Sequence, residues 1–341
     1  MSSKSSATER GTSRALIPRF EPHPWFRGPH AQTIAGVYLP SPRVRLASIP
    51  HTLPLGDGDS LVLLETTPPR WRTGDPAAVL VHGLGGDAHS PYIGRMAARL
   101  TRLGVRVVRM NLRGAGEGFG LARGIYHAGL TEDVRKVIEW LAAEAPGSPI
   151  ALVGYSLGAS LTLKLAAEAA SDPVSGLECI IAANPPLDLS ACCRHIRRPE
   201  NRHYDRHFVK GLKAGIARLH RRFPELGPPG LEGIKTLHDF DDQYTAKRAG
   251  FASAEDYYSR SSAKGRIAEI RLPGLVVHAA DDPFIPVEPF HEVSFPDNLP
   301  LELIPRGGHL GYLSRKRWGP DRRWLDARLA AWLTDRWNLS E

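Results

Sequence analysis

Short apolar runs that end in glycine-rich loops alternate along this chain with segments of helical periodicity, and this alternation limits the possible folds most. Strand-like runs occupy residues 77–86, 105–118, 149–156 and 177–186, and helical patterns occupy 90–100, 131–145 and 157–165. Parallel strands need crossover connections of this length, usually helices. The alternation therefore predicts an α/β fold with a mostly parallel central sheet that is flanked by helices on both faces.

Residues 188–262 interrupt this alternation. They are charged and aromatic, they carry many Pro and Gly residues, and they contain no clear apolar strand. Strand-like runs resume at 272–286 and 299–312, and an amphipathic helix at 321–337 closes the chain. We therefore expect a core built from 20–187 and 263–341, a mainly helical cap insertion at 188–262, and a disordered N-terminal tail at 1–19, which is polar.

Composition excludes several classes of protein. No apolar run approaches the ~18 residues that a membrane span needs, and the N-terminus lacks the apolar stretch of a secretory signal. The chain has three cysteines, Cys179, Cys192 and Cys193, an odd number that suits neither a disulfide framework nor a metal site. We expect a cytoplasmic protein without a bound metal or organic cofactor.

The net charge of +8 is concentrated in one segment. Residues 194–222 hold ten Lys and Arg residues against Glu200 and Asp205, so this segment alone matches the excess of the whole chain. The segment is interpreted as a solvated basic face of the insertion, or as a site of weak association with an anionic membrane surface. No nucleic-acid-binding motif accompanies it, so no nucleic acid is expected as a partner.

The stretch ALVGYSLGAS, residues 151–160, places Ser156 in a G-x-S-x-G pattern directly after an apolar run. This pattern is typical of a strand that turns sharply into a helix and exposes the serine oxygen at the corner. Gly154 and Gly158 allow the two backbones to pass closely there. Any glycine-flanked serine in a turn also fits the pattern, so a catalytic role for Ser156 depends on matching residues elsewhere in the chain.

Three further loops follow predicted strands and carry complementary chemistry. His309 follows the last strand behind two glycines and suits a general base for the serine. Asp281 and Asp282 end the strand before it, and one of them could orient the imidazole, although their spacing does not decide which. The glycines of HGLGG, residues 82–86, would free the amide near Leu84 to bind an oxyanion together with the amide of Leu157.

The order Ser, Asp, His resembles the α/β-hydrolase superfamily, and several longer motifs resemble its YheT-like branch. These motifs are WFRGPHAQTI (25–34), VLVHGLGG (79–86), NLRGAGEG (111–118), AANPPLDL (182–189), AADDPFIP (279–286), GGHLGY (307–312) and the stretch 237–263. The resemblance implies Ser156 as nucleophile, His309 as base and Asp282 as acid. It favours Asp282 over Asp281 because the family pattern places its aspartate at a fixed distance before the motif FIP. Members of this branch are carboxylesterases, several acting on short acyl esters and some on glycerolipids.

The sequence therefore predicts a serine hydrolase that cleaves small-molecule carboxylic esters through an acyl-enzyme. An acyltransferase or a thioesterase would use the same three residues. A third alternative is a non-catalytic protein that binds anionic surfaces through its basic segment, although such a protein has no need of three matched residues.

Overall fold

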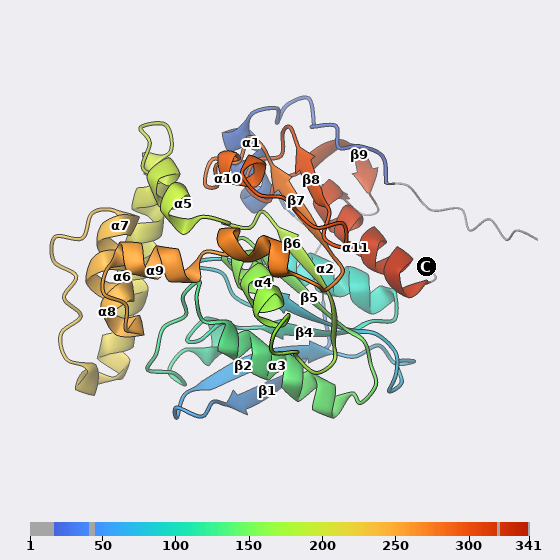
Figure 1. Cartoon of the computed structure of the whole chain (residues 1–341), viewed down its shortest axis with the longest axis horizontal. Coiled ribbons are helices and arrows are strands. Elements are labelled where there is room, and N and C mark those ends of the chain that lie inside the picture. Colours follow the sequence, from blue (N-terminus) through green and yellow to red (C-terminus); the bar gives the residue numbers. More distant parts are fainter. Residues whose placement is uncertain (1–16, 41–44, 319–320, 340–341) are drawn as a thin grey trace, which may run out of the picture.

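The computed structural model describes residues 17–40, 45–318 and 321–339, and it is built around an eight-stranded sheet (Figure 1). The strands are β1 (Ile49–Pro54), β2 (Ser60–Thr66), β3 (Ala77–Val81), β4 (Arg106–Met110), β5 (Ile150–Tyr155), β6 (Leu177–Ala183), β7 (Gly274–Ala279) and β8 (Leu301–Ile304). Their order is β1-β2-β4-β3-β5-β6-β7-β8. All pairs from β4 to β8 are parallel, and only β1–β2 and β2–β4 are antiparallel. The mostly parallel sheet predicted from the alternation is confirmed.

Helices cover both faces of the sheet. On one face lie α2 (Pro91–Arg102) and α11 (Trp324–Trp337), and on the other lie α3 (Thr131–Glu144) and α4 (Leu157–Glu168). Successive side chains of a strand point to opposite faces, so Leu80 of β3 packs in one cluster with Met96, while Val79 packs in the other with Ile138. Burial on both faces explains why the central strands read as continuous apolar runs.

The chain between β6 and β7 is helical and lies beyond one end of the sheet (Figure 1). It forms α5 (Leu189–Ile196), α6 (Arg202–Arg222), α7 (Leu237–Phe240), the π-helical turn η3 (Asp241–Thr245), α8 (Ala246–Ala249) and α9 (Ala254–Ser261). Short 3₁₀ turns are η1 (Gly116–Gly118), η2 (Pro224–Leu226) and η4 (Lys264–Glu269). These helices have a hydrophobic cluster of their own, which includes Val209, Leu219, Phe240 and Tyr244.

The N-terminal helix α1 (Pro29–Tyr38) packs against a hairpin formed by β9 (Leu313–Trp318) and β10 (Asp321–Arg323), and α10 (Glu288–His291) follows β7. The Gln32 side chain accepts from the Leu313 amide at 2.7 Å and donates to the Leu313 carbonyl at 3.0 Å. Of the expected tail 1–19, residues 1–16 lie outside the described part. Within 17–19, the Pro18 carbonyl accepts a hydrogen bond from the Trp324 indole at 2.9 Å.

In residues 17–40, 45–318 and 321–339, no helix is both long enough and apolar enough to cross a bilayer. Cys179 and Cys193 are buried and Cys192 is half-buried, and all three are free thiols.

Candidate active site

Ser156 forms the sharp corner between β5 and α4. Its backbone has φ 52° and ψ −122°, which a residue with a side chain rarely adopts. A Cβ added to Gly154 would lie 2.2 Å from the Gly158 carbonyl oxygen, and one added to Gly158 would lie 2.4 Å from the Val81 carbonyl oxygen. Only glycine fits at both positions, so the strand, the corner and the helix hold the serine in its strained conformation.

The structure brings Ser156, Asp282 and His309 into one hydrogen-bonded row. The three residues follow β5, β7 and β8, whose carboxyl ends meet at one edge of the parallel sheet. His309 Nε2 lies 3.0 Å from Ser156 Oγ, and His309 Nδ1 lies 2.8 Å from Asp282 Oδ2. The contacting pairs Ser156–His309 and Asp282–His309 are separated by 153 and 27 positions in the sequence.

The Asp282 carboxylate sets the direction of these hydrogen bonds. Burial by itself would raise its pKa, but the charge and hydrogen bond of His309 and the Phe284 amide outweigh burial and lower the pKa below its ordinary value. An ionised carboxylate only accepts, so His309 Nδ1 carries the proton and donates it to Asp282. His309 Nε2 is then the acceptor for the Ser156 hydroxyl, the arrangement that general-base activation requires.

Asp281, the other aspartate of the pair, faces a different group. Its Oδ1 accepts hydrogen bonds from the amides of Gly307 at 2.8 Å and Gly308 at 2.9 Å. Burial raises the pKa of Asp281, while these two amides oppose that shift. Asp281 therefore fixes the glycine turn that carries His309, and it has no hydrogen bond to the imidazole among the described contacts.

The glycine-rich loop after β3 lies against Ser156. A Cβ added to Gly83 would lie 2.9 Å from the Ser156 Cβ, so this close approach requires glycine. The Gly83 amide donates to the Tyr92 hydroxyl at 3.0 Å, and the Gly85 amide donates to the Tyr126 hydroxyl at 2.9 Å. Two half-buried tyrosines thus fix the amides on either side of Leu84.

The second expected oxyanion donor, Leu157, is the first residue of α4. Its amide lies in the first turn, where backbone N–H groups have no acceptor within the helix. A helix N-terminus also favours negative charge nearby. The amides of Leu84 and Leu157 therefore come from two segments that both contact Ser156.

Three residues of the site were not identified from the sequence. The Asn184 side chain donates to Asp282 Oδ2 at 2.6 Å and accepts from the Tyr312 hydroxyl at 2.9 Å. The Thr33 hydroxyl accepts from the backbone amide of His309 at 2.9 Å. Asn184 directly follows β6, and a polar residue at the end of a buried strand is the signal that could have revealed it.

The Phe284 ring, in the loop after β7, covers the imidazole, and aromatic side chains of the inserted helices pack against Phe284 in turn. The Phe284 ring lies 4.4 Å from the His309 ring between centroids, and Tyr204 and Phe208 of α6 pack against Phe284 at 4.7 and 5.4 Å. The His309 side chain is consequently only 10% exposed. Among the described residues, no group of three or more His, Cys, Asp or Glu side chains is arranged to hold a metal ion.

Comparison with known proteins identifies relatives of this chain. Residues 78–334 match the family described as "Alpha/beta hydrolase family". The chain is 35% identical over 291 residues to a protein of Escherichia coli (strain K12) named "Putative esterase YheT", covering 83% of each chain. It is 28% identical over 289 residues to the medium-chain fatty acid ethyl ester synthase/esterase 2 of Saccharomyces cerevisiae, covering 76% of this chain but only 62% of that relative.

The fold also resembles that of a solved esterase, Pf2001 of Pyrococcus furiosus. The TM-score is 0.56 and the identity is 15%, with 94% of this chain and 98% of that chain covered. At this identity the likeness concerns the fold alone. Because the family match spans most of the chain and YheT is similar over most of both lengths, this chain belongs to the alpha/beta hydrolase family, in the branch that includes YheT.

Proposed function

We propose that this protein hydrolyses small-molecule carboxylic esters with Ser156 as nucleophile, His309 as general base and Asp282 as the acid that orients the imidazole. The observation that carries the proposal is the row of contacts of 3.0 and 2.8 Å that ends on an ionised, buried carboxylate. The relatives of this chain are named as esterases, a lipase and phospholipases. The protein is accordingly an enzyme of the carboxylic ester hydrolase class.

The proposed reaction has two halves. The Ser156 hydroxyl attacks the ester carbonyl and gives its proton to His309 Nε2, while the amides of Leu84 and Leu157 stabilise the oxyanion. The protonated imidazole then gives that proton to the departing alcohol, which leaves an acyl-enzyme on Ser156. A water molecule, activated by the same imidazole, releases the carboxylic acid and restores the serine.

The inserted helices are proposed to select the substrate. Residues 188–262 act in this proposal as a cap, since Tyr204 and Phe208 of α6 reach Phe284 above the imidazole. An apolar aromatic cover suits the acyl part of an ester, either a short chain or a chain of a glycerolipid. The basic segment 194–222 lies in the same insertion and adds attraction for anionic surfaces.

Substitution of the nucleophile tests the proposal. Ser156→Ala should lower the turnover of a p-nitrophenyl acyl ester by about 10⁶-fold, the loss seen when a triad serine is removed. Ser171→Ala, which changes an exposed serine after α4, serves as the matched control and should hydrolyse the ester at the normal rate. Retention of most activity in Ser156→Ala would refute the assignment of the nucleophile.

Transfer of the acyl group to an alcohol is a second candidate activity, because the yeast relative is named as a synthase as well as an esterase. The same acyl-enzyme would give an ester when ethanol, rather than water, attacks it. Incubation with a medium-chain acyl ester and ethanol, followed by chromatography of the products, distinguishes hydrolysis from acyl transfer. Ethyl ester formed by the wild type but absent with Ser156→Ala would establish transfer at this site, and free acid alone would exclude it.

A further inference from the structure

An exposed apolar patch surrounds α1. Large hydrophobic side chains that are exposed in the described structure concentrate in residues 25–39. They are Trp25, Ile34, Val37, Tyr38 and Leu39, which we call the α1 patch. Trp25 is 83% exposed and Tyr38 is 75% exposed. Residues 34, 37 and 38 follow the i, i+3, i+4 spacing, so their side chains share one face of the helix.

The opposite face of α1 supports the proposed active site. Thr33 is buried and accepts the backbone amide of His309, and Gln32 is buried against Leu313. At the start of the helix, His30 Nδ1 lies 3.1 Å from the hydroxyl of Tyr204, whose ring packs against Phe284 beside the imidazole. A surface that meets the α1 patch is therefore separated from His309 by a single helix.

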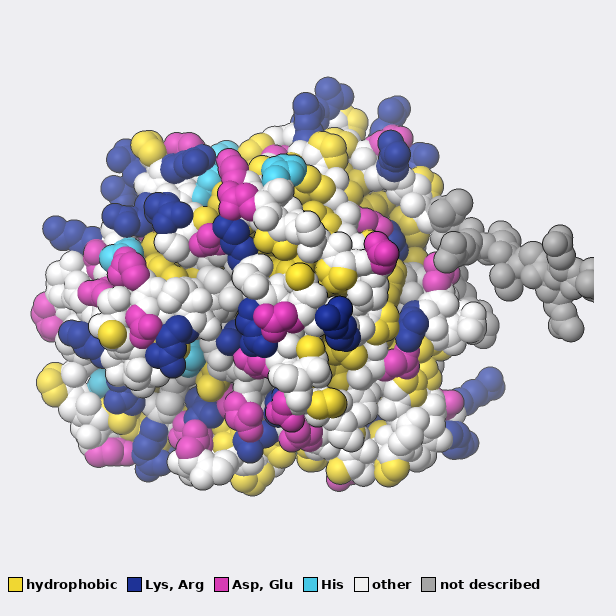
Figure 2. All heavy atoms as spheres, in the orientation of Figure 1, with side chains coloured by type: hydrophobic (Ala, Val, Ile, Leu, Met, Phe, Trp, Pro, Cys, Tyr) yellow, Lys and Arg dark blue, Asp and Glu magenta, His cyan; other side chains and the backbone are white. Residues whose placement is uncertain are grey.

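Positive side chains flank the α1 patch. Arg27 is exposed in the turn before α1, and Arg315, Lys316 and Arg317 are exposed on β9, which packs against α1. Figure 2 shows Lys and Arg side chains gathered along the upper edge of the molecule, where Figure 1 places α5, α1 and β9. Exposed apolar and aromatic residues bordered by cations are the combination that binds the interface of an anionic lipid layer.

We propose that the α1 patch docks this protein on an anionic lipid surface and so presents lipid esters to Ser156. The apolar side chains enter the headgroup region, while Arg27 and the cations of β9 lie against the negative headgroups. The binding step rests on the α1 patch and its flanking cations, and it does not depend on the role proposed for Ser156. Only the supply of an ester to Ser156 rests on the function proposed above.

Vesicle flotation with a matched pair of variants tests the apolar part of this surface. Val37 is 60% exposed in the α1 patch, and Ile49 is 61% exposed on β1, in a different part of the chain. On vesicles of 30% phosphatidylglycerol in phosphatidylcholine, Val37→Glu should reduce the bound fraction about tenfold, because a carboxylate cannot enter the interface. Ile49→Glu should bind like the wild type.

A second pair of variants tests the charged part. Lys316→Glu/Arg317→Glu should weaken binding to the same vesicles, whereas Arg70→Glu/Arg102→Glu, which reverses two exposed charges outside β9, should not. Wild-type binding should also fall on pure phosphatidylcholine and at high salt, since screening weakens exposed charges. If the two double variants bound the vesicles equally, net charge rather than the α1 patch would govern attachment, and the proposal would be overturned.

The outcomes separate this proposal from the proposed chemistry. Hydrolysis of a water-soluble p-nitrophenyl ester should be the same in Val37→Glu as in the wild type, while hydrolysis of an ester embedded in the vesicles should fall. If the wild type bound the vesicles but hydrolysed no ester, the proposed function would be refuted and the docking surface would stand. Vesicle binding that Val37→Glu leaves unchanged would refute the docking surface. A dimer in sedimentation that Val37→Glu dissociates would also refute it, because the α1 patch would then be the contact with a second copy of this chain.

Discussion

At the scale of single residues, Asn184 connects the acid of the site to the core. Its amide nitrogen donates to Asp282 and its oxygen accepts from the buried Tyr312 hydroxyl, so neither group of Asn184 is free to turn. Its backbone has φ 48°, a conformation that asparagine and glycine tolerate best. Asn184 therefore acts as a positioning residue for Asp282 and not as a group that touches the substrate.

Asn184→Gly should lower kcat about tenfold to a hundredfold with KM changed less than about twofold. The reason is that a hydrogen bond to a charged group contributes about 1.5–3 kcal/mol, while glycine keeps the backbone conformation. Steady-state kinetics on a p-nitrophenyl ester measures both constants. Asn338→Gly is the control, since Asn338 also has a positive φ, 49°, but is exposed after α11. An equal kcat in the two variants would contradict the role of Asn184.

The sequence predicts some residues of the site and not others for a physical reason. Ser156 is marked by a local pattern, because the strand-to-helix corner needs glycine at fixed positions on both sides. The choice of Asp282 over Asp281 came from the family resemblance, since both side chains leave the same loop. Asn184 and Thr33 act through contacts between distant segments, and periodicity does not reveal such contacts.

At the scale of whole elements, the strands from β3 to β8 are predicted best, whereas the buried strand β2 was not predicted. The runs that became β3 to β8 are apolar and end in glycines or polar loops, and they lie in the sheet as expected. By contrast, β1 is exposed at alternate positions and contains two prolines, and α1 turns its large apolar residues outward. Neither segment shows the pattern of an element that buries one face, so neither was predicted.

The π-helical turn η3 contains a half-buried acid, Asp241, whose oxygens accept from Tyr258 and Thr245. Burial raises the pKa of Asp241 to about 6. The folded chain therefore binds more protons than the unfolded chain between about pH 4 and 6, and stability falls as pH rises through this range. About two pKa units correspond to about 3 kcal/mol, so the wild type should lose this much between pH 4 and 7 relative to Asp241→Asn.

Chemical denaturation at several pH values measures that difference, because the contributions of other groups cancel between the two proteins. Asp335→Asn, which changes an exposed aspartate of α11, is the control and should follow the wild type at every pH. Parallel stability curves for the wild type and Asp241→Asn would show that Asp241 titrates alike in the folded and unfolded chain, contrary to this expectation.

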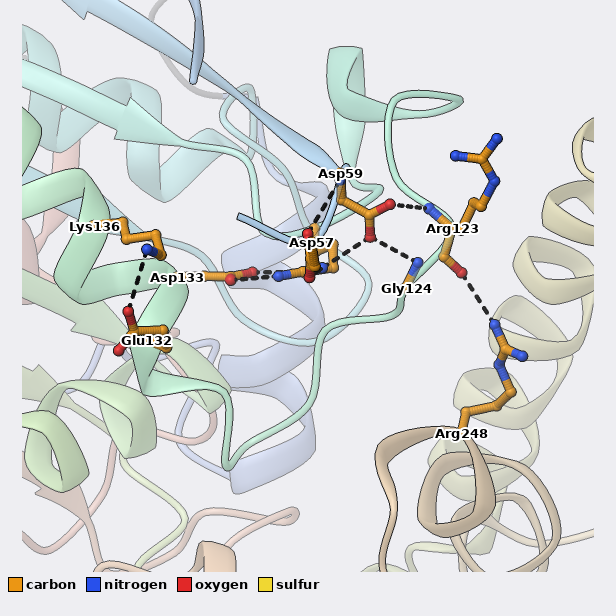
Figure 3. A network of polar contacts seen from close by, with 9 residues as sticks. Asp57, Asp59, Arg123, Gly124, Glu132, Asp133, Lys136 and Arg248 are labelled. Carbon is orange, nitrogen blue, oxygen red and sulfur yellow. Dashed lines mark hydrogen bonds and ion pairs between the residues drawn. The ribbon is translucent and has the colours of Figure 1, made fainter. Parts of the chain in front are cut away.

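At the scale of the whole molecule, a polar network around Arg113 joins segments that no single element connects. Figure 3 labels other members of this network, among them Asp59, Asp133, Arg123 and Arg248. Arg113, in the loop after β4, donates to Asp59 of the β1–β2 turn at 2.8 Å and to both oxygens of Asp133 in α3 at 2.7 and 3.0 Å. Asp59 also accepts from the amide of Arg123, whose carbonyl accepts from Arg248 in α8. The network thus runs from the edge of the sheet to the inserted helices.

Arg113→Met should lower the free energy of unfolding by about 3–5 kcal/mol, because it leaves the buried carboxylates of Asp59 and Asp133 without their cation. Burial already raises the pKa of Asp133, and Arg113 opposes that shift. Without Arg113 the pKa of Asp133 should rise further, so protonation should neutralise the buried charge and the deficit should shrink as pH falls. Urea denaturation at pH 7 and pH 5 measures both effects, with Arg102→Met, on the exposed end of α2, as the control. A loss that is the same at the two pH values would mean that packing of the arginine stem, and not the unpaired carboxylates, accounts for the instability.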